Sequence, residues 1–187
     1  MPAAARLGYF GKLPGHGDFV RAGLSEESVA AWDGWVRAGM IESRAMLGEG
    51  WLAAFLEAPV WAFGIAPGLC GGAGLAGVMA PSVDAAGRYF PLMIAAAVAD
   101  PPEPEQSHAW FATLAIAAAD AVHEAWTQAR LGAAITSAGP PPCVTGQMRG
   151  CVFATDGAPR VARCARRFAT LPPADAFAAL LTDAAVP

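Results

Sequence analysis

The chain has 187 residues, a formal net charge of -4 at pH 7, 15% charged residues and 55% hydrophobic residues. A chain of this length is expected to form one domain, 1–187, and to bury roughly 70% of the surface that its unfolded form exposes without a metal or disulfide staple. Its acidic balance excludes a nucleic-acid partner, which requires clustered lysine and arginine.

The first half of the chain predicts an alternation of strands and helices. Ser25 followed by two glutamates indicates a helix start, because a hydroxyl caps the first free amides and acids favour the positive end of the helix dipole. Pro91 has no amide to donate, so we expect a bulge or a free edge there. The predicted elements are a strand at 6–11, a loop at 14–17, a helix from Ser25 to Gly48, a short helix at 51–56 and strands at 60–66, 74–80 and 88–98.

The second half predicts a return to the same sheet. The predicted elements are one long alanine-rich helix at about 106–131, a loop at 139–142, a hairpin formed by 151–155 and 161–168, and a terminal helix after Pro172-Pro173. So many alanines imply that the long helix approaches its neighbours closely. The element order predicts an α+β fold, an antiparallel sheet of five to six strands flanked by helices.

Two features bear on the compartment. Residues 58–83 carry no charge, but prolines and glycines would break any helix of about 20 residues there, so no membrane insertion is expected. The N-terminus lacks the apolar run of a signal peptide. The cysteines, which form no CxxC pair, are expected to be buried free thiols in a reducing cytoplasm: Cys70, Cys143, Cys151 and Cys164.

Asp33 falls inside the apolar stripe of the first predicted helix, so its carboxylate is expected to be part-buried. Such a group must be paired, because desolvating a lone charge costs several kcal/mol. We expect a structural ion pair and not a catalytic acid. The candidate cations are Arg37, one helical turn further on, and, from other elements, Lys12, Arg21 and Arg88.

The glycine-rich loop at 11–18 does not have the spacing of a phosphate-binding loop, and Pro14 removes one amide that a phosphate cradle needs. His16 and Asp18 would supply only two metal ligands, so no metal site is predicted. The glycines are expected to provide turns.

Ser82 would need a nearby base to act as a nucleophile. The sequence leaves His16 as a candidate for that base, although Ser82 does not lie in a GxSxG motif. The simpler interpretation is a turn between strands, in which Asp84 accepts from backbone amides and pairs with Arg88. Trp35 lies at the edge of its helical stripe, where an indole can anchor an interface.

Several multi-residue blocks occur in a recognisable order. They are Gly8-Tyr9-Phe10-Gly11-Lys12-Leu13-Pro14 with Gly17-Asp18-Phe19, Trp32-Asp33-Gly34-Trp35, Ala58-Pro59-Val60-Trp61, Pro81-Ser82-Val83-Asp84 and Gly87-Arg88-Tyr89-Phe90-Pro91-Leu92. Together they resemble the N-terminal domain of the TagF family, also called ImpM, whose members are accessory proteins of bacterial type VI secretion. The resemblance is dense over 8–92 and looser beyond 100. Ala62 departs from it, because an arginine is expected after Trp61.

The resemblance implies a cytoplasmic, non-enzymatic protein without a cofactor, acting after translation as a negative regulator by binding the forkhead-associated scaffold protein of the secretion apparatus. It also implies a longin- or profilin-like α/β/α sandwich. The phosphatase domain that some members carry fused behind this one is not expected here. The side chains expected to face the partner are Lys12, Asp18, Arg21, Arg88 and Trp35.

Two alternatives stay open. One is an enzyme, either a hydrolase using Ser82 or a phosphatase-like protein acting on a phosphorylated regulator. The other is a longin-like adaptor for a small GTPase, which rests on fold analogy alone. A histidine nitrogen within about 3.5 Å of Ser82 Oγ would favour the hydrolase.

Overall fold

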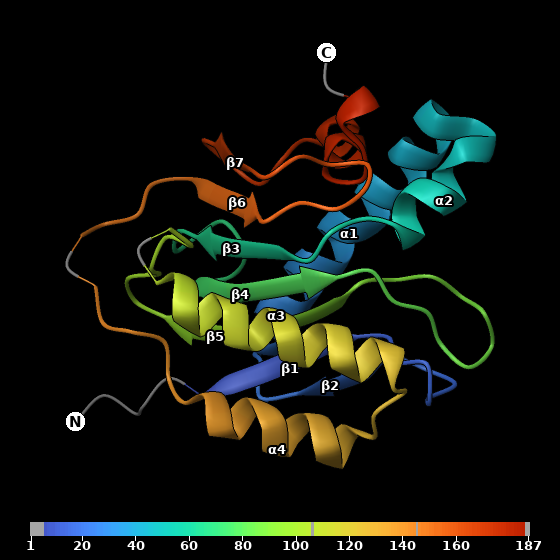
Figure 1. Ribbon diagram of the computed structural model, residues 1–187. Helices are drawn as coiled ribbons and strands as arrows, with labels where there is room; N and C mark the ends of the chain where they lie inside the picture. The colour runs from blue at the N-terminus through green and yellow to red at the C-terminus, as the bar shows by residue number, and fades with distance from the viewer. Residues whose placement is uncertain (1–5, 106, 145, 186–187) are drawn as a thin grey trace.

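The computed structural model describes residues 6–105, 107–144 and 146–185. Their strands form one sheet in the order β2-β1-β5-β4-β3-β6-β7, in which every neighbouring pair is antiparallel (Figure 1). The strands are β1 Leu7–Gly11, β2 Val20–Ala22, β3 Trp61–Ile65, β4 Gly74–Ala80, β5 Leu92–Val98, β6 Cys151–Thr155 and β7 Cys164–Phe168.

Helices cover both faces of the sheet, which confirms the α+β class (Figure 1). The α-helices are α1 Glu26–Leu47, α2 Trp51–Leu56, α3 His108–His123 and α4 Gln128–Ala138, and the 3₁₀ segments are η1 Gly48–Gly50, η2 Ala174–Leu180 and η3 Asp183–Ala185. Helices α1 and α2 lie on one face together with η2, and α3 and α4 lie on the other. No helix within the described ranges is long and apolar enough to cross a membrane.

Helix α1 begins and ends where the sequence predicts. Ser25 is its N-cap, and its hydroxyl accepts from the Ser28 amide at 3.1 Å. Gly48 ends the helix with φ 52°, a left-handed conformation that glycine adopts without strain. The buried stripe includes Val29, Trp32 and Val36, which turn the helix toward the sheet.

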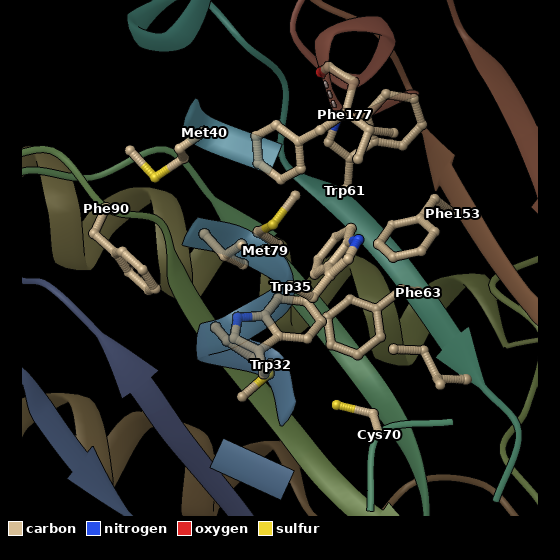
Figure 2. Close-up of a cluster of buried hydrophobic side chains, with 14 of the residues drawn as sticks. Trp32, Trp35, Met40, Trp61, Phe63, Cys70, Met79, Phe90, Phe153 and Phe177 are labelled. Atoms are coloured by element: carbon tan, nitrogen blue, oxygen red, sulfur yellow. Dashed lines mark hydrogen bonds between the residues drawn. The ribbon is translucent and has the colours of Figure 1, made fainter. Parts of the chain in front are cut away.

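The core between α1 and the sheet is rich in aromatic rings (Figure 2). Trp32 lies 4.9 Å from Phe63 and 5.0 Å from Trp35 between ring centroids. The C-terminal segment closes this core, because Trp61 Nε1 donates to the Leu180 carbonyl at 2.8 Å. The Trp61 ring is therefore buried while its N–H group keeps a hydrogen-bond partner.

The core between the sheet and α3–α4 has a different composition. Ala118 and Ala121 of α3 are fully buried there, together with Leu114. Their small side chains allow the helix backbone to approach β4 closely. The expected close approach of the alanine-rich segment is confirmed.

The predicted long helix is wrong. Helix α3 ends at His123, Ala125 takes a positive φ of 49°, and α4 starts again at Gln128. Thr127 caps α4, and its hydroxyl accepts from the Arg130 amide at 3.2 Å. The sequence at the break, residues 124–127, contains no glycine or proline that would predict it. Residue 106, in the predicted start, lies outside the described residues.

Other features of the fold also differ from the prediction. The sheet has seven strands instead of five to six, because β2 follows the glycine-rich loop and pairs with β1 over three residues, too few to show an alternating pattern. The last strand of the first half starts at Leu92, after Pro91, and not at Arg88. The terminal helix is a 3₁₀ segment, although Phe177 is buried as expected.

Candidate functional site

The turn after β4 gathers polar side chains around Asp84, whose own side chain is fully buried. Its Oδ2 accepts from Lys12 Nζ at 2.5 Å and from Arg88 Nε at 2.8 Å. Its Oδ1 accepts from the backbone amides of Ala86 and Arg88, both at 2.9 Å. Four donors thus satisfy the carboxylate, as a buried acid requires.

The protonation state of Asp84 follows from these contacts. Desolvation by burial would by itself raise its pKa, because burial penalises the charged form. The hydrogen bonds from Lys12 and Arg88 and the positive charge of Lys12 outweigh that effect and hold the pKa well below its usual range. Asp84 is therefore a charged anchor at neutral pH.

The same turn is tied to the glycine-rich loop through the backbone. Ser82 Oγ donates to the Lys12 carbonyl at 2.7 Å, and the Ala85 amide donates to the His16 carbonyl at 2.8 Å. An Arg88 guanidinium nitrogen donates to the Gly17 carbonyl at 2.5 Å. We name this network the Asp84 junction: the loop 12–17, the turn 82–88 and the contacts between them.

Ser82 does not have the surroundings of a nucleophile. Its side chain is buried, and its hydroxyl donates to a carbonyl instead of to a base. Among the hydrogen bonds of the described residues, none joins Ser82 to His16 or to another histidine. Within the same ranges no group of three or more histidine, cysteine or acidic side chains is placed to hold a metal ion.

Asp33 pairs with Arg37, the nearest of the predicted cations, with Nε and Oδ2 2.7 Å apart. The Arg37 guanidinium also lies 5.4 Å from the centroid of the Phe19 ring and 5.8 Å from that of Phe90. Phe19 and Phe90 pack edge to face at 4.9 Å. This arginine therefore links α1 to the residues that directly follow the two loops of the Asp84 junction.

The structure separates the five side chains that we expected to face a partner. Asp18, Arg21 and Arg88 are exposed. Lys12 is only 4% exposed and Trp35 only 8%. The prediction that these two side chains lie at the surface is wrong. Lys12 Nζ donates to Asp84 Oδ2, and the Trp35 indole donates to the Pro172 carbonyl.

Sequence reasoning also missed a groove of about 440 Å³ beside α3, on the face that α3 covers only in part. Its floor is made of small side chains from three strands, including Ala62 of β3, so the residue that departs from the family resemblance lies in the groove. The sequence predicts the hairpin of β6 and β7 but gives no signal that joins it to β3, since these strands meet only through sheet pairing. The lining also includes Ala112 and Ala115 of α3, Ala154 of β6 and Ala165 of β7.

The four cysteines are free thiols, as predicted, but they are not all buried. Burial raises the pKa of Cys70 and of Cys151 to about 12 in each case. Cys164 is part-exposed and Cys143 is exposed, so the expectation of a buried thiol is wrong for Cys143. Cys143 lies on the loop before β6, away from the hydrophobic cores.

The fold and the Asp84 junction define an α+β domain in which a buried carboxylate holds two loops together. Residues 8–138 match the TagF N-terminal domain, type VI secretion system-associated. The chain belongs to this family, which confirms the resemblance. The fold is similar to the crystal structure of PA0076 from Pseudomonas aeruginosa PAO1, with a TM-score of 0.86, 31% sequence identity and coverage of 95% of this chain and 94% of that chain. No curated protein sequence gives a significant match.

Proposed function

We propose that the protein is a cytoplasmic, non-enzymatic accessory protein of type VI secretion. In this proposal it acts after translation as a negative regulator, by binding the forkhead-associated scaffold protein of the apparatus, and its sandwich is of the longin or profilin type. Membership of the TagF family supports the secretion context.

The observation that carries the proposal is the way in which the polar motif residues are used. Asp84, Lys12 and Ser82 are buried, and each bonds to another part of the Asp84 junction. A catalytic acid, base or nucleophile must instead reach a substrate. The motif therefore supports a protein that holds two loops in a fixed shape for recognition.

Arg88 joins the buried part of the junction to its surface. Its Nε contacts the buried carboxylate, while its side chain is 58% exposed and reaches the loop that carries Asp18. Arg21, on the edge strand β2, is exposed and 3.4 Å from Glu26. We propose that Asp18, Arg21 and Arg88 contact the partner, because exposed charges on a fixed frame supply orientation and specificity.

A pull-down with the purified forkhead-associated protein of the same apparatus tests the proposal. The wild-type chain should retain that protein, and Asp18→Lys or Arg21→Glu should retain less of it. Arg149→Glu is the matched control, since Arg149 is an exposed arginine on the loop before β6. The proposal fails if the wild-type chain retains no scaffold protein. If Arg149→Glu weakens retention as much as Arg21→Glu, the assigned contact residues are wrong.

A further inference from the structure

The large apolar side chains that the described residues expose are concentrated on one hairpin. Ile41 and Met46 of α1 are 69% and 49% exposed, and Leu52 and Leu56 of α2 are 41% and 52% exposed. The fifth such residue, Ile116, lies apart on α3. Single exposed apolar residues are ordinary on protein surfaces. Here four of the five lie within sixteen residues of one another on two consecutive helices.

This hairpin, residues 41–57, is anchored to the core and does not depend on a partner for its shape. Trp51 is buried, donates from Nε1 to Ser43 Oγ at 2.9 Å and stacks on Phe55 at 5.0 Å. Arg44 lies over the same indole, with its guanidinium carbon 4.1 Å from the ring centroid. Because Leu52 and Leu56 are one turn apart, they share the outer face of α2 while Trp51 and Phe55 fix its inner face.

The hairpin also carries an excess of negative charge, with three glutamates and one arginine between residues 41 and 57. Glu57 is paired with Arg160 at 2.6 Å. Glu42 and Glu49 are exposed, and no lysine, arginine or histidine among the described residues lies within 4.0 Å of either carboxylate. The single arginine is held over Trp51.

We propose that the hairpin 41–57 is a docking surface for a basic amphipathic segment of the secretion-apparatus partner, one in which lysine or arginine flanks large apolar side chains. The proposal rests on the proposed function and names the surface and the chemistry that it recognises. The apolar side chains supply affinity by burial. The unpaired Glu42 and Glu49 favour a cationic segment and speed its approach.

Two double variants test the two parts of this proposal, with the purified forkhead-associated protein as the probe. Leu52→Ser with Leu56→Ser removes apolar surface, and we expect its Kd to rise at least roughly tenfold. Glu42→Lys with Glu49→Lys reverses the charge. This variant should bind several-fold more weakly. Salt should weaken binding by the wild-type chain but not binding by this variant.

Ile116→Ser is the matched control, because it removes an exposed apolar side chain of similar accessibility from another element. It should bind as the wild-type chain does, and circular dichroism should show all variants folded. If the wild-type chain binds and both double variants bind equally well, the hairpin assignment is overturned while the proposed function stands. Tighter binding by the charge-reversed variant would overturn a basic partner segment. No binding by the wild-type chain would end the proposed function and this inference together.

Discussion

Replacing Gly39 by alanine tests how the C-terminal segment is joined to α1. Gly39 lies in the interior of α1 and is buried against Phe177 of η2. A Cβ atom at this position would lie 2.4 Å from the Cδ2 and Cγ atoms of the Phe177 ring and 2.7 Å from its Cβ. These separations are too short for carbon atoms, so either the ring or the helix must move.

Two opposing effects set the size of the change. Alanine is favoured over glycine inside a helix by about 1 kcal/mol. Overpacking a core that cannot relax costs about 1–3 kcal/mol. The upper part of that range applies here, because Phe177 is fully buried and the clash involves its Cβ as well as its ring. We therefore expect Gly39→Ala to lower the free energy of unfolding by about 1–2 kcal/mol.

Gly34→Ala is the control in the same helix, since a Cβ at Gly34 meets no atom within 4 Å. It should raise the free energy of unfolding by about 0.5–1 kcal/mol. Urea unfolding followed by tryptophan fluorescence measures both changes, provided that the slopes with urea stay equal. In a Phe177→Ala background the destabilisation by Gly39→Ala should be smaller, because the ring is removed while the Cβ of residue 177 still lies 2.7 Å from the added Cβ. If Gly39→Ala stabilises the wild-type chain as much as Gly34→Ala does, the contact with Phe177 is not as described.

Three further predictions concern the backbone, the thiols and the pH dependence. Ala125→Gly should stabilise the chain by up to about 1 kcal/mol. A φ of 49° costs an alanine roughly 1–2 kcal/mol, and the greater freedom of glycine in the unfolded chain offsets part of the gain from removing that strain. A lower midpoint in urea would refute this prediction. In a thiol-labelling time course at pH 8, Cys143 should react fast while Cys70 and Cys151, with pKa values raised to about 12 by burial, stay unlabelled until the chain unfolds; fast labelling of Cys70 would contradict their burial. Because the pKa of Asp84 is lower in the folded than in the unfolded chain, its stabilising contribution is complete above about pH 4 and declines as the pH falls below that value. The stability difference between the wild-type chain and Asp84→Asn should therefore shrink below about pH 4 in urea titrations, and a difference unchanged from pH 7 to pH 3 would refute the assignment.

Most elements of the first half could be predicted, although not β2, because their signals are local. Ser25 announces the start of α1 and Gly48 its end, and both act through their own backbone neighbourhood. Asp84 likewise accepts a hydrogen bond from a backbone amide and pairs with Arg88 within one short turn. Such contacts are readable from sequence because the partners are a few residues apart.

Contacts that depend on the sheet could not be predicted in the same way. The sequence makes Lys12 a possible partner of Asp33, yet Lys12 pairs with Asp84, 72 residues away. The reason is that β1 and β4 lie on either side of β5 and both end beside its first residues. Trp35 lies at the edge of its stripe on a helical wheel, but the C-terminal segment covers it. The break at Ala125 carries no turn residue, so helical periodicity alone extends the helix through it.

Isothermal titration calorimetry of the purified chain into the purified forkhead-associated protein tests the central claim most directly. We predict a saturable heat of binding that is weakened by salt and reduced by substitution of Leu52 and Leu56. A titration without binding heat at several temperatures, with both proteins folded, would contradict the claim that this chain acts by holding that scaffold protein.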